Sequence, residues 1–202
     1  MYVRFGKRLA DILLSMLALL VLLIPMLLVA IAIMAVDPGS PVFVQKRVGC
    51  HKKYFYCIKF RTMVHNAPCD VPTHLLENPE KYFICGGRIL RKLSIDELPQ
   101  LINILLGHMS IVGPRPALWN QEDLVAERDR YGANDVRPGL TGWAQINGRD
   151  ELGIPEKARL DGEYVQKLSF SFDCKCLLKT VRKVVAGEGV VEGAAEGGKD
   201  RG

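Results

Sequence analysis

The stretch ILLSMLALLVLLIPMLLVAIAIMAV, residues 12–36, decides how this chain of 202 residues is built. It contains 25 consecutive residues without a charge. As a straight helix it would be about 37 Å long, enough to cross the ~30 Å hydrocarbon core of a bilayer. It is too long for a cleaved signal peptide, and no small-residue cleavage site precedes Asp37. We therefore expect residues 1–37 to form a membrane element.

Pro25 divides this stretch into apolar pieces of 13 and 11 residues, each too short to span the membrane alone. A proline inside a helix removes one hydrogen bond and clashes with the preceding turn, so we expect the helix to break here. Basic residues flank the stretch on both sides: Arg4, Lys7, Arg8, Lys46, Arg47, Lys52 and Lys53. The positive-inside bias then places both ends in the cytoplasm, which a re-entrant helix satisfies. A single-pass helix that tolerates its proline is the alternative, and composition alone does not separate the two.

The whole chain has the composition of a globular protein. Hydrophobic residues make up 49% and charged residues 24%, which excludes a largely disordered chain. A polytopic membrane protein is excluded as well, because one stretch alone is apolar enough for a bilayer. The net charge is +5, and residues 38–92 carry ten Lys and Arg against three acidic residues, a local charge of +7. Such a block favours anionic lipid headgroups or phosphorylated substrates. We expect no nucleic-acid partner, because the block lacks an interleaved pattern of stacking aromatic residues.

We expect a mostly helical α+β fold with few short strands. The expected strands are Val42–Val44 and Tyr54–Phe60, and the expected helices are residues 97–106, 156–168 and 172–186. The last of these is amphipathic and basic, which suits either the membrane interface or the core. The division is then a membrane helix (1–37), a cytoplasmic globular domain (38–186) and a disordered tail without function (187–202). The six cysteines form no CxxC pair, which indicates reduced thiols in the cytoplasm.

The clearest soluble helix begins beside two adjacent carboxylates, Asp96 and Glu97. Apolar residues recur at helical spacing from residue 98 to residue 105. Ser94 and Glu97 match a capping box. If Asp96 is instead the N-cap, Pro99 falls in the first turn of the helix, where the backbone N–H groups have no partner within the helix and a missing N–H costs nothing. By composition alone, the two carboxylates are most simply helix-start residues that the helix dipole favours.

Four motifs give these carboxylates another interpretation. They are Lys59-Phe60-Arg61-Thr62-Met63, Asp96-Glu97-Leu98-Pro99-Gln100-Leu101, Gly113-Pro114-Arg115-Pro116 and Arg137-Pro138-Gly139-Leu140-Thr141-Gly142-Trp143-Ala144-Gln145. In this order, they resemble the bacterial sugar transferases known as monotopic phosphoglycosyltransferases, over about residues 4–180. Ile24 and His108 depart from the family pattern, which usually has Ser before the helix-breaking proline and Asp within Gly-Asp-Met-Ser.

The resemblance implies a membrane enzyme that moves a phosphosugar from a UDP-sugar to polyprenyl (undecaprenyl) phosphate and releases UMP, the first membrane step of glycoconjugate or exopolysaccharide assembly. It implies a re-entrant helix, and hence a protein on the cytoplasmic face of the cytoplasmic membrane, with both termini inside and in contact with lipid of the inner leaflet. It further implies Asp96 as the nucleophile of a covalent aspartyl-phosphosugar intermediate, Glu97 as its partner, and Mg²⁺ bound by Asp96 and Glu97. A membrane-anchored scaffold that binds UDP-sugar or lipid without catalysis is the alternative. An enzyme that transfers the sugar alone and leaves UDP is another.

Basic and amide side chains near these motifs are the candidate substrate ligands. We expect a basic floor for the lipid phosphate at Lys59, Arg61, Arg88 and Arg91. Arg115, held between two prolines, offers a pre-positioned fork for a phosphate. We expect the nucleotide sugar at Arg137, Gln145, Asn147 and Arg149. For any one of these arginines a solvated or salt-bridged role is the competing interpretation. Nothing in the sequence specifies an oligomeric state.

Overall fold

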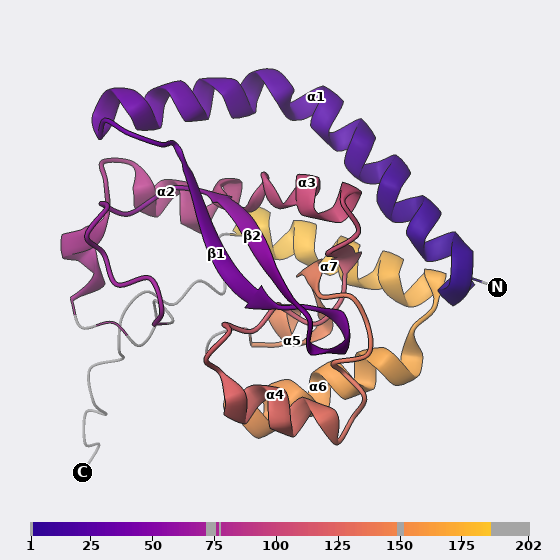
Figure 1. Ribbon diagram of the computed structural model, residues 1–202. Coiled ribbons are helices and arrows are strands. Elements are labelled where there is room, and N and C mark those ends of the chain that lie inside the picture. The colour runs from indigo at the N-terminus through magenta and orange to yellow at the C-terminus, as the bar shows by residue number, and fades with distance from the viewer. Residues whose placement is uncertain (1, 72–75, 77, 149–151, 187–202) are drawn as a thin grey trace, which may run out of the picture.

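The computed structural model describes residues 2–71, 76, 78–148 and 152–186 of the chain (Figure 1). Its helices are α1 (Lys7–Val36), α2 (Gly87–Lys92), α3 (Gln100–Leu105), α4 (Glu122–Asp129), α5 (Trp143–Ile146), α6 (Ile154–Lys167) and α7 (Phe170–Ala186). Its strands are β1 (Val42–Val48), β2 (Tyr54–Phe60), β3 (Ser110–Val112) and β4 (Gly139–Thr141). A π-helical turn covers Tyr2–Gly6, and 3₁₀ turns cover Cys50–Lys52, Pro79–Tyr82 and Ile95–Glu97. The mostly helical α+β class is confirmed.

The long apolar stretch forms one helix, α1, which continues through Pro25. Figure 1 shows α1 bending as it arches over the rest of the molecule. The expected break is therefore a bend within a continuous helix, and the residues after the proline, among them Met26 and Val29, pack against the domain. Within the described ranges, α1 is the one helix long and apolar enough to cross a membrane. The re-entrant path itself stays a prediction.

One face of α1 packs along the domain. Its residues there recur at helical spacing: Ala18, Leu19, Leu22, Met26, Val29, Ala30 and Ile33. They contact buried side chains that include those of β2 and α3. The opposite face is apolar and exposed; Leu20 is 75% and Ile24 is 70% exposed. An exposed apolar face of this kind marks contact with a membrane or with another protein.

Polar contacts attach both ends of α1 to the domain. Near its beginning, Arg8 donates to two backbone carbonyls at the end of α3 (2.6 and 2.9 Å). The buried carboxylate of Asp11 accepts two hydrogen bonds from β3 (2.8 and 3.0 Å). Directly after its end, Asp37 forms an ion pair with Arg61, the residue that follows β2. The helix is thus held to one and the same domain at both of its ends.

β1 and β2 form an antiparallel hairpin, in which Val42 pairs with Phe60 and Val48 pairs with Tyr54. The bounds of β2 are those predicted. β1 is longer than the predicted strand Val42–Val44, because its polar residues 45–47 keep the ladder pairing and find partners for their side chains.

β3 and β4 pair in parallel and bring two of the sequence motifs into backbone contact. A Cβ atom at Gly113 would lie 2.5 Å from the carbonyl oxygen of Arg137, and one at Gly142 would lie 2.0 Å from the carbonyl oxygen of Gly113. Only glycine permits so close an approach. The glycines of both motifs therefore fix where the loop that carries Arg115 begins.

The predicted helix 97–106 is wrong in its first part. α3 begins after Pro99, and Ile95–Glu97 forms a separate 3₁₀ turn before it. The capping box is absent, because Ser94 makes no side-chain capping hydrogen bond and has a left-handed backbone with φ of +56°. The left-handed residue turns the chain before the carboxylates, and Pro99, which separates the 3₁₀ turn from α3, has no N–H to donate to the preceding turn.

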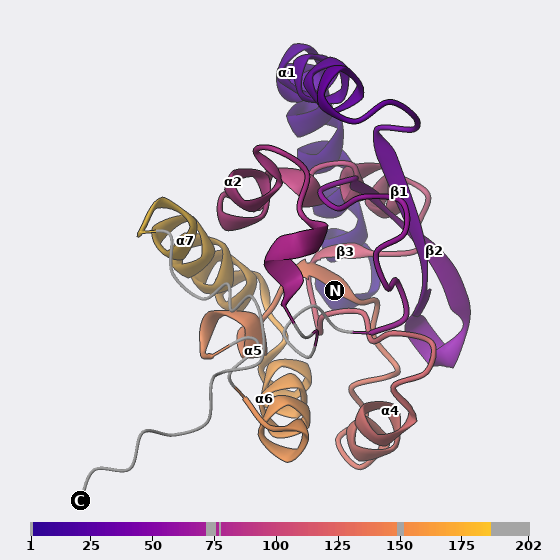
Figure 2. The same cartoon turned by 90° about the vertical axis from the view of Figure 1, so that its left-hand side faces the viewer.

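The two later helices are confirmed as α6 and α7, and the predicted tail 187–202 lies outside the described residues. α7 serves the core on its inner face, where the buried Cys176 packs in one cluster with Trp143 and Tyr164. Figures 1 and 2 show α1 on one side of the molecule and α4 and α6 at the opposite end. The hairpin and α3 lie between them.

Candidate active site

Asp96 and Glu97 lie in the short 3₁₀ turn that separates α2 from α3. The left-handed Ser94 before this turn is a non-glycine residue in a sparsely populated conformation, of a kind that clusters at functional sites. Both carboxylates are buried, with exposed fractions of 5% for Asp96 and 6% for Glu97. They lie in a separate turn before α3 and not in the first turn of this helix, where composition alone favoured placing them.

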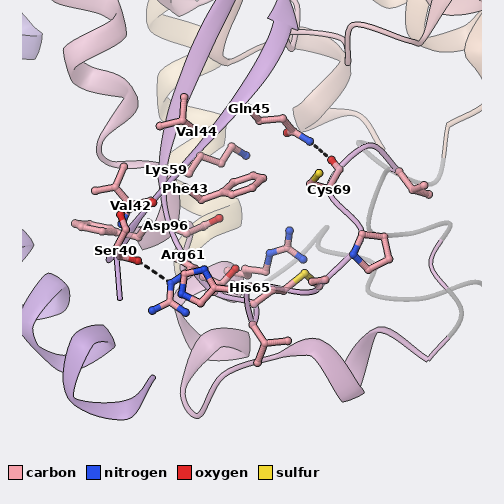
Figure 3. Close-up of a pocket in the computed structure, with 18 of the residues that line it drawn as sticks. Ser40, Val42, Phe43, Val44, Gln45, Lys59, Arg61, His65, Cys69 and Asp96 are labelled. Carbon is pink, nitrogen blue, oxygen red and sulfur yellow. Dashed lines mark hydrogen bonds between the residues drawn. The ribbon is translucent and has the colours of Figure 1, made fainter. Parts of the chain in front are cut away.

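Asp96 lines a cavity of about 400 Å³ between the hairpin and residues 64–71 (Figure 3). Four basic side chains line the same cavity: Arg47, Lys59, Arg61 and Arg91. Much of the remaining lining is apolar and includes Val42, Phe43, Val44, Phe60, Met63 and Val71. A carboxylate among cations beside an apolar wall suits an anionic ligand that also has apolar or aromatic parts.

Glu97 joins three of the four motifs. Its Oε1 accepts a hydrogen bond from Nζ of Lys59 and another from Nη2 of Arg115, both 2.9 Å long. The side chains of Glu97 and Lys59 are 8% and 13% exposed, so this ion pair is shielded from water. The lysine comes from β2 and the arginine from the loop after β3. Segments far apart in the sequence thus converge on the carboxylate pair.

Opposing effects act on the pKa of Asp96. Burial raises the pKa of Asp96, and the charge of Glu97 raises it further. The charges of Lys59, Arg91 and Arg115 act in the opposite direction and lower this pKa. A carboxylate with a raised pKa in a cavity is a recognised sign of a functional site. A positive charge added nearby would further stabilise the ionised form of the Asp96 carboxylate.

The donor chemistry at this turn fits Mg²⁺. Mg²⁺ prefers oxygen ligands and commonly binds through one or two carboxylates together with water and substrate phosphates. Asp96 offers such a carboxylate to the cavity, with Glu97 beside it. Among the described residues, no cluster of three His, Cys, Asp or Glu side chains could hold a metal by itself. The two carboxylates would therefore share the ion with a phosphate ligand.

The predicted basic floor is brought to the cavity in part. Lys59, Arg61 and Arg91 line it. The buried guanidinium of Arg61 also bonds Asp37 and the carbonyl oxygen of Ser40 (2.7 Å), which ties down the turn after α1. Arg91 and Arg88 stack over the ring of Phe83, 5.5 and 5.7 Å from its centroid. Arg88 is not among the residues that line the cavity.

The predicted nucleotide-sugar residues lie elsewhere. Arg137, Gln145 and Asn147 donate to backbone carbonyls at 2.9, 3.1 and 2.7 Å, and none of the three lines the cavity. Arg149 lies outside the described residues. His108, where the family pattern has Asp, is exposed, and its ring lies 5.8 Å from that of Phe55. Substrate contact by these residues stays a prediction.

Sequence reasoning missed several polar residues of the cavity, among them Gln45 and Arg47. Both lie on β1 beyond the point at which the predicted strand ended. The signal was the alternation of a strand, since Phe43, Gln45 and Arg47 fall on one face when the strand is extended to Val48. The cavity wall formed by residues 64–71 left no such signal, because its sequence has no periodicity.

The chain shares extensive sequence similarity with known proteins. The family described as "Bacterial sugar transferase" matches residues 2–187. The uncharacterized sugar transferase EpsL of Bacillus subtilis is 47% identical over 165 residues, which cover 81% of this chain and 80% of that protein. The exopolysaccharide production protein ExoY of Sinorhizobium fredii is 36% identical over 198 residues, covering 91% and 87%. The UDP-glucose:undecaprenyl-phosphate glucose-1-phosphate transferase of Escherichia coli is 40% identical over 187 residues, covering 89% of this chain and 40% of that protein.

Proposed function

The chain belongs to the bacterial sugar transferase family, and from this membership we propose that it transfers a phosphosugar from a UDP-sugar to polyprenyl phosphate and releases UMP. One observation carries the proposal: the buried carboxylate of Asp96 faces a cavity lined by four basic side chains. The relative from Escherichia coli is named for such a transfer of glucose 1-phosphate to undecaprenyl phosphate. ExoY is named for exopolysaccharide production, and this supports our proposal that the transfer is the first membrane step of glycoconjugate or exopolysaccharide assembly.

The first step uses Asp96 as the nucleophile. A carboxylate oxygen of Asp96 forms a bond to the β-phosphorus of the UDP-sugar, while the bond from this phosphorus to the bridging oxygen breaks. UMP leaves with the bonding electron pair, and the phosphosugar stays on Asp96. The burial that raises the pKa of this carboxyl also removes water that would compete with the carboxylate.

The second step returns the enzyme to its starting state. An oxygen of the polyprenyl phosphate attacks the same phosphorus, and the bond to Asp96 breaks. The lipid then carries the phosphosugar through a diphosphate, and the Asp96 carboxylate is free again. Because both steps move a phosphoryl centre between anionic oxygens, positive charge and positioning are the main requirements.

The side chains around the turn supply that charge. Lys59 and Arg115 hold Glu97 in place at 2.9 Å, and with Arg91 they favour the ionised form of Asp96. When bound by Asp96 and Glu97, Mg²⁺ would lower the repulsion between carboxylate and diphosphate and stabilise the departing UMP. The basic side chains that line the cavity also favour an anionic substrate there.

We place the protein on the cytoplasmic face of the membrane with α1 dipping into one leaflet. Both ends of α1 bind the same domain, through Arg8 and Asp11 at one end and Asp37 at the other. A helix that crossed the bilayer would separate its ends by about 30 Å of hydrocarbon and break one of these attachments. The exposed apolar face of α1 then contacts lipid, and both termini lie inside the cell.

α7 supports the same placement. Its outer surface exposes Phe170, Leu178 and Val181 next to Lys175 and Lys179. Apolar side chains flanked by basic ones are typical of a helix at the membrane interface. The inner face of α7 packs in the core, so the helix serves both of the roles that its sequence allowed. With this orientation a lipid phosphate and a soluble nucleotide sugar reach the cavity from the same side of the membrane.

The reaction is tested with purified protein in nanodiscs, polyprenyl phosphate, Mg²⁺ and a panel of UDP-sugars. We expect UMP as the product with at least one UDP-sugar. Without polyprenyl phosphate, UMP release should stop at one equivalent per protein, and chelation of Mg²⁺ should abolish turnover. Release of UDP would instead indicate transfer of the sugar alone. Binding without either product would indicate a scaffold. The panel also identifies the sugar.

A further inference from the structure

The loop of residues 113–120, here called the Arg115 loop, connects the carboxylate turn to the wall of the cavity. At its beginning, Arg115 bonds Glu97. Farther along, the ring nitrogen of Trp119 and the side-chain amide of Asn120 donate to Asp70, at 3.0 Å to its carboxylate and 2.9 Å to its carbonyl oxygen. Asp70 belongs to the cavity wall, residues 64–71, which contributes much of the cavity lining.

Two side chains of β1 make a second connection between the same two segments. Arg47 donates through Nη1 to the carbonyl oxygen of Pro116 in the Arg115 loop (2.9 Å) and through Nε to Oε1 of Gln45 (3.0 Å). Gln45 in turn donates through Nε2 to the carbonyl oxygen of Cys69 in the cavity wall, a contact drawn in Figure 3. The hydrogen bonds therefore run without a gap from wall to loop.

We propose that Gln45 and Arg47 are positioning residues that fix the Arg115 loop and the cavity wall relative to each other, so that one arrangement both presents Arg115 to Glu97 and closes the cavity. The inference rests on the proposed function, because loop and wall border the cavity in which that reaction would take place. It assigns a positioning role to Gln45, and to Arg47 a positioning role in addition to the positive charge that this residue adds to the cavity lining.

The chemistry of these two residue types matches the role. A guanidinium is planar and carries five N–H groups, so it can bond two oxygens in different directions at once. A glutamine amide accepts on one side and donates on the other, which lets Gln45 pass the connection from Arg47 to Cys69. Among the described residues, the hydrogen bonds of Arg47 go to neutral oxygens of Gln45 and Pro116.

Charge alone does not explain Arg47. Burial, and after it the like charge of Arg115, lower the pKa of Arg47 to about 10. Arg47 thus stays charged at neutral pH and repels Arg115. The backbone of β1 adds to the attachment. Arg47 forms an isolated β-bridge with Leu118, and the backbone N–H of Val48 donates to a carbonyl oxygen of the Arg115 loop.

Two substitutions separate the connections. In Arg47→Lys, the charge is kept, but a single ammonium cannot replace the fork between Gln45 and Pro116. In Gln45→Glu, an acceptor for Arg47 is kept, but the donor to Cys69 is lost. Arg130→Lys, directly after α4, is the matched control, since Arg130 is exposed and pairs with Glu127 three residues before it.

Hydrogen exchange of the full chain in nanodiscs tests the connections without any activity. We expect Arg47→Lys to accelerate exchange in peptides that cover both 64–71 and 113–120. We expect Gln45→Glu to accelerate exchange in 64–71 alone, and Arg130→Lys to change neither segment. Unchanged exchange in both segments of Arg47→Lys would overturn the proposal, even if the protein proves to catalyse a different reaction.

A double-mutant cycle tests the functional part. UMP release should fall about tenfold in kcat for Arg47→Lys, the scale of one lost charge-assisted hydrogen bond. If Arg47 acts through Arg115, the variant with both Arg47→Lys and Arg115→Lys should match Arg115→Lys alone within about twofold. Losses that multiply would show that Arg47 acts by itself and would overturn the positioning role. A wild-type protein that releases no UMP would refute the proposed function, and the exchange result would still decide whether the connection exists.

Discussion

Replacing Lys59 by Met tests the electrostatic account of the carboxylate turn most sharply. Met keeps most of the length and volume of the side chain and removes its charge. Lys59 and Glu97 are 13% and 8% exposed and 2.9 Å apart, so the interaction that is lost is a shielded, charge-assisted hydrogen bond. Such a bond is worth about 1.5–3 kcal/mol. At about 1.4 kcal/mol per factor of ten, we expect kcat/KM for UMP release to fall roughly 10- to 150-fold at neutral pH.

The pH dependence gives this prediction a second, independent part. Lys59 lowers the pKa of Asp96, and in the proposed reaction the ionised form of Asp96 is the nucleophile. Without Lys59 the pKa of Asp96 rises further, so the acidic limb of the pH–rate profile should move to higher pH. The loss should then be larger at pH ~6 than at pH ~9, where even the variant carboxyl is ionised.

The control and the refuting result are equally specific. Lys46→Met changes an exposed lysine of the neighbouring strand, which lies 4.1 Å above the ring of Tyr54, and it should leave kcat/KM within about twofold. If Lys59→Met also stays within twofold, or if its loss is the same at every pH, the electrostatic account of Glu97 and Asp96 is wrong.

Three further predictions concern stability and topology. Asp37→Ala leaves the buried guanidinium of Arg61 without its carboxylate partner. The loss should cost about 2–3 kcal/mol of stability, after a discount for the partial exposure of Asp37, and should lower Tm by roughly 4–12 °C in a thermal melt. The control Asp135→Ala removes one partner of an exposed pair and should leave Tm unchanged. Because the folded-state pKa of Asp96 lies above its unfolded value, ionisation of Asp96 costs stability as pH rises through that interval. Asp96→Asn should therefore melt at a higher temperature than the wild type at pH ~7, with no difference near pH ~3. Single cysteines placed at positions 4 and 46 should both resist a membrane-impermeant thiol reagent in intact cells; labelling of only one would mean that α1 spans the membrane.

The sequence alone was enough for the parts of the fold that local pattern specifies. The uncharged stretch became α1, and the aromatic run Tyr54–Phe60 became β2 with the bounds expected. The motif order also predicted which segments meet in space, because Lys59 and Arg115, from two distant motifs, both bond Glu97 of a third.

The rest depended on interactions that no local pattern contains. The left-handed backbone of Ser94 separates the carboxylate turn from α2, and Leu98 and Pro99 separate the turn from α3, whereas the helical spacing of apolar residues predicted one helix from residue 97. Gln45 and Arg47 were overlooked because polar residues late in a strand look like a turn until their partners in distant loops are known. Pro25 was expected to break α1, but the neighbouring apolar packing holds the helix together as a bend.

The most direct test of the account is to search for the covalent intermediate on Asp96. The protein is incubated with Mg²⁺ and a UDP-sugar that it uses, without polyprenyl phosphate, and its peptides are examined by mass spectrometry. We predict one UMP per protein and the mass of one phosphosugar on the peptide that contains Asp96, with neither in Asp96→Asn. Steady UMP release upon addition of the lipid acceptor, with no adduct before it, would contradict the account.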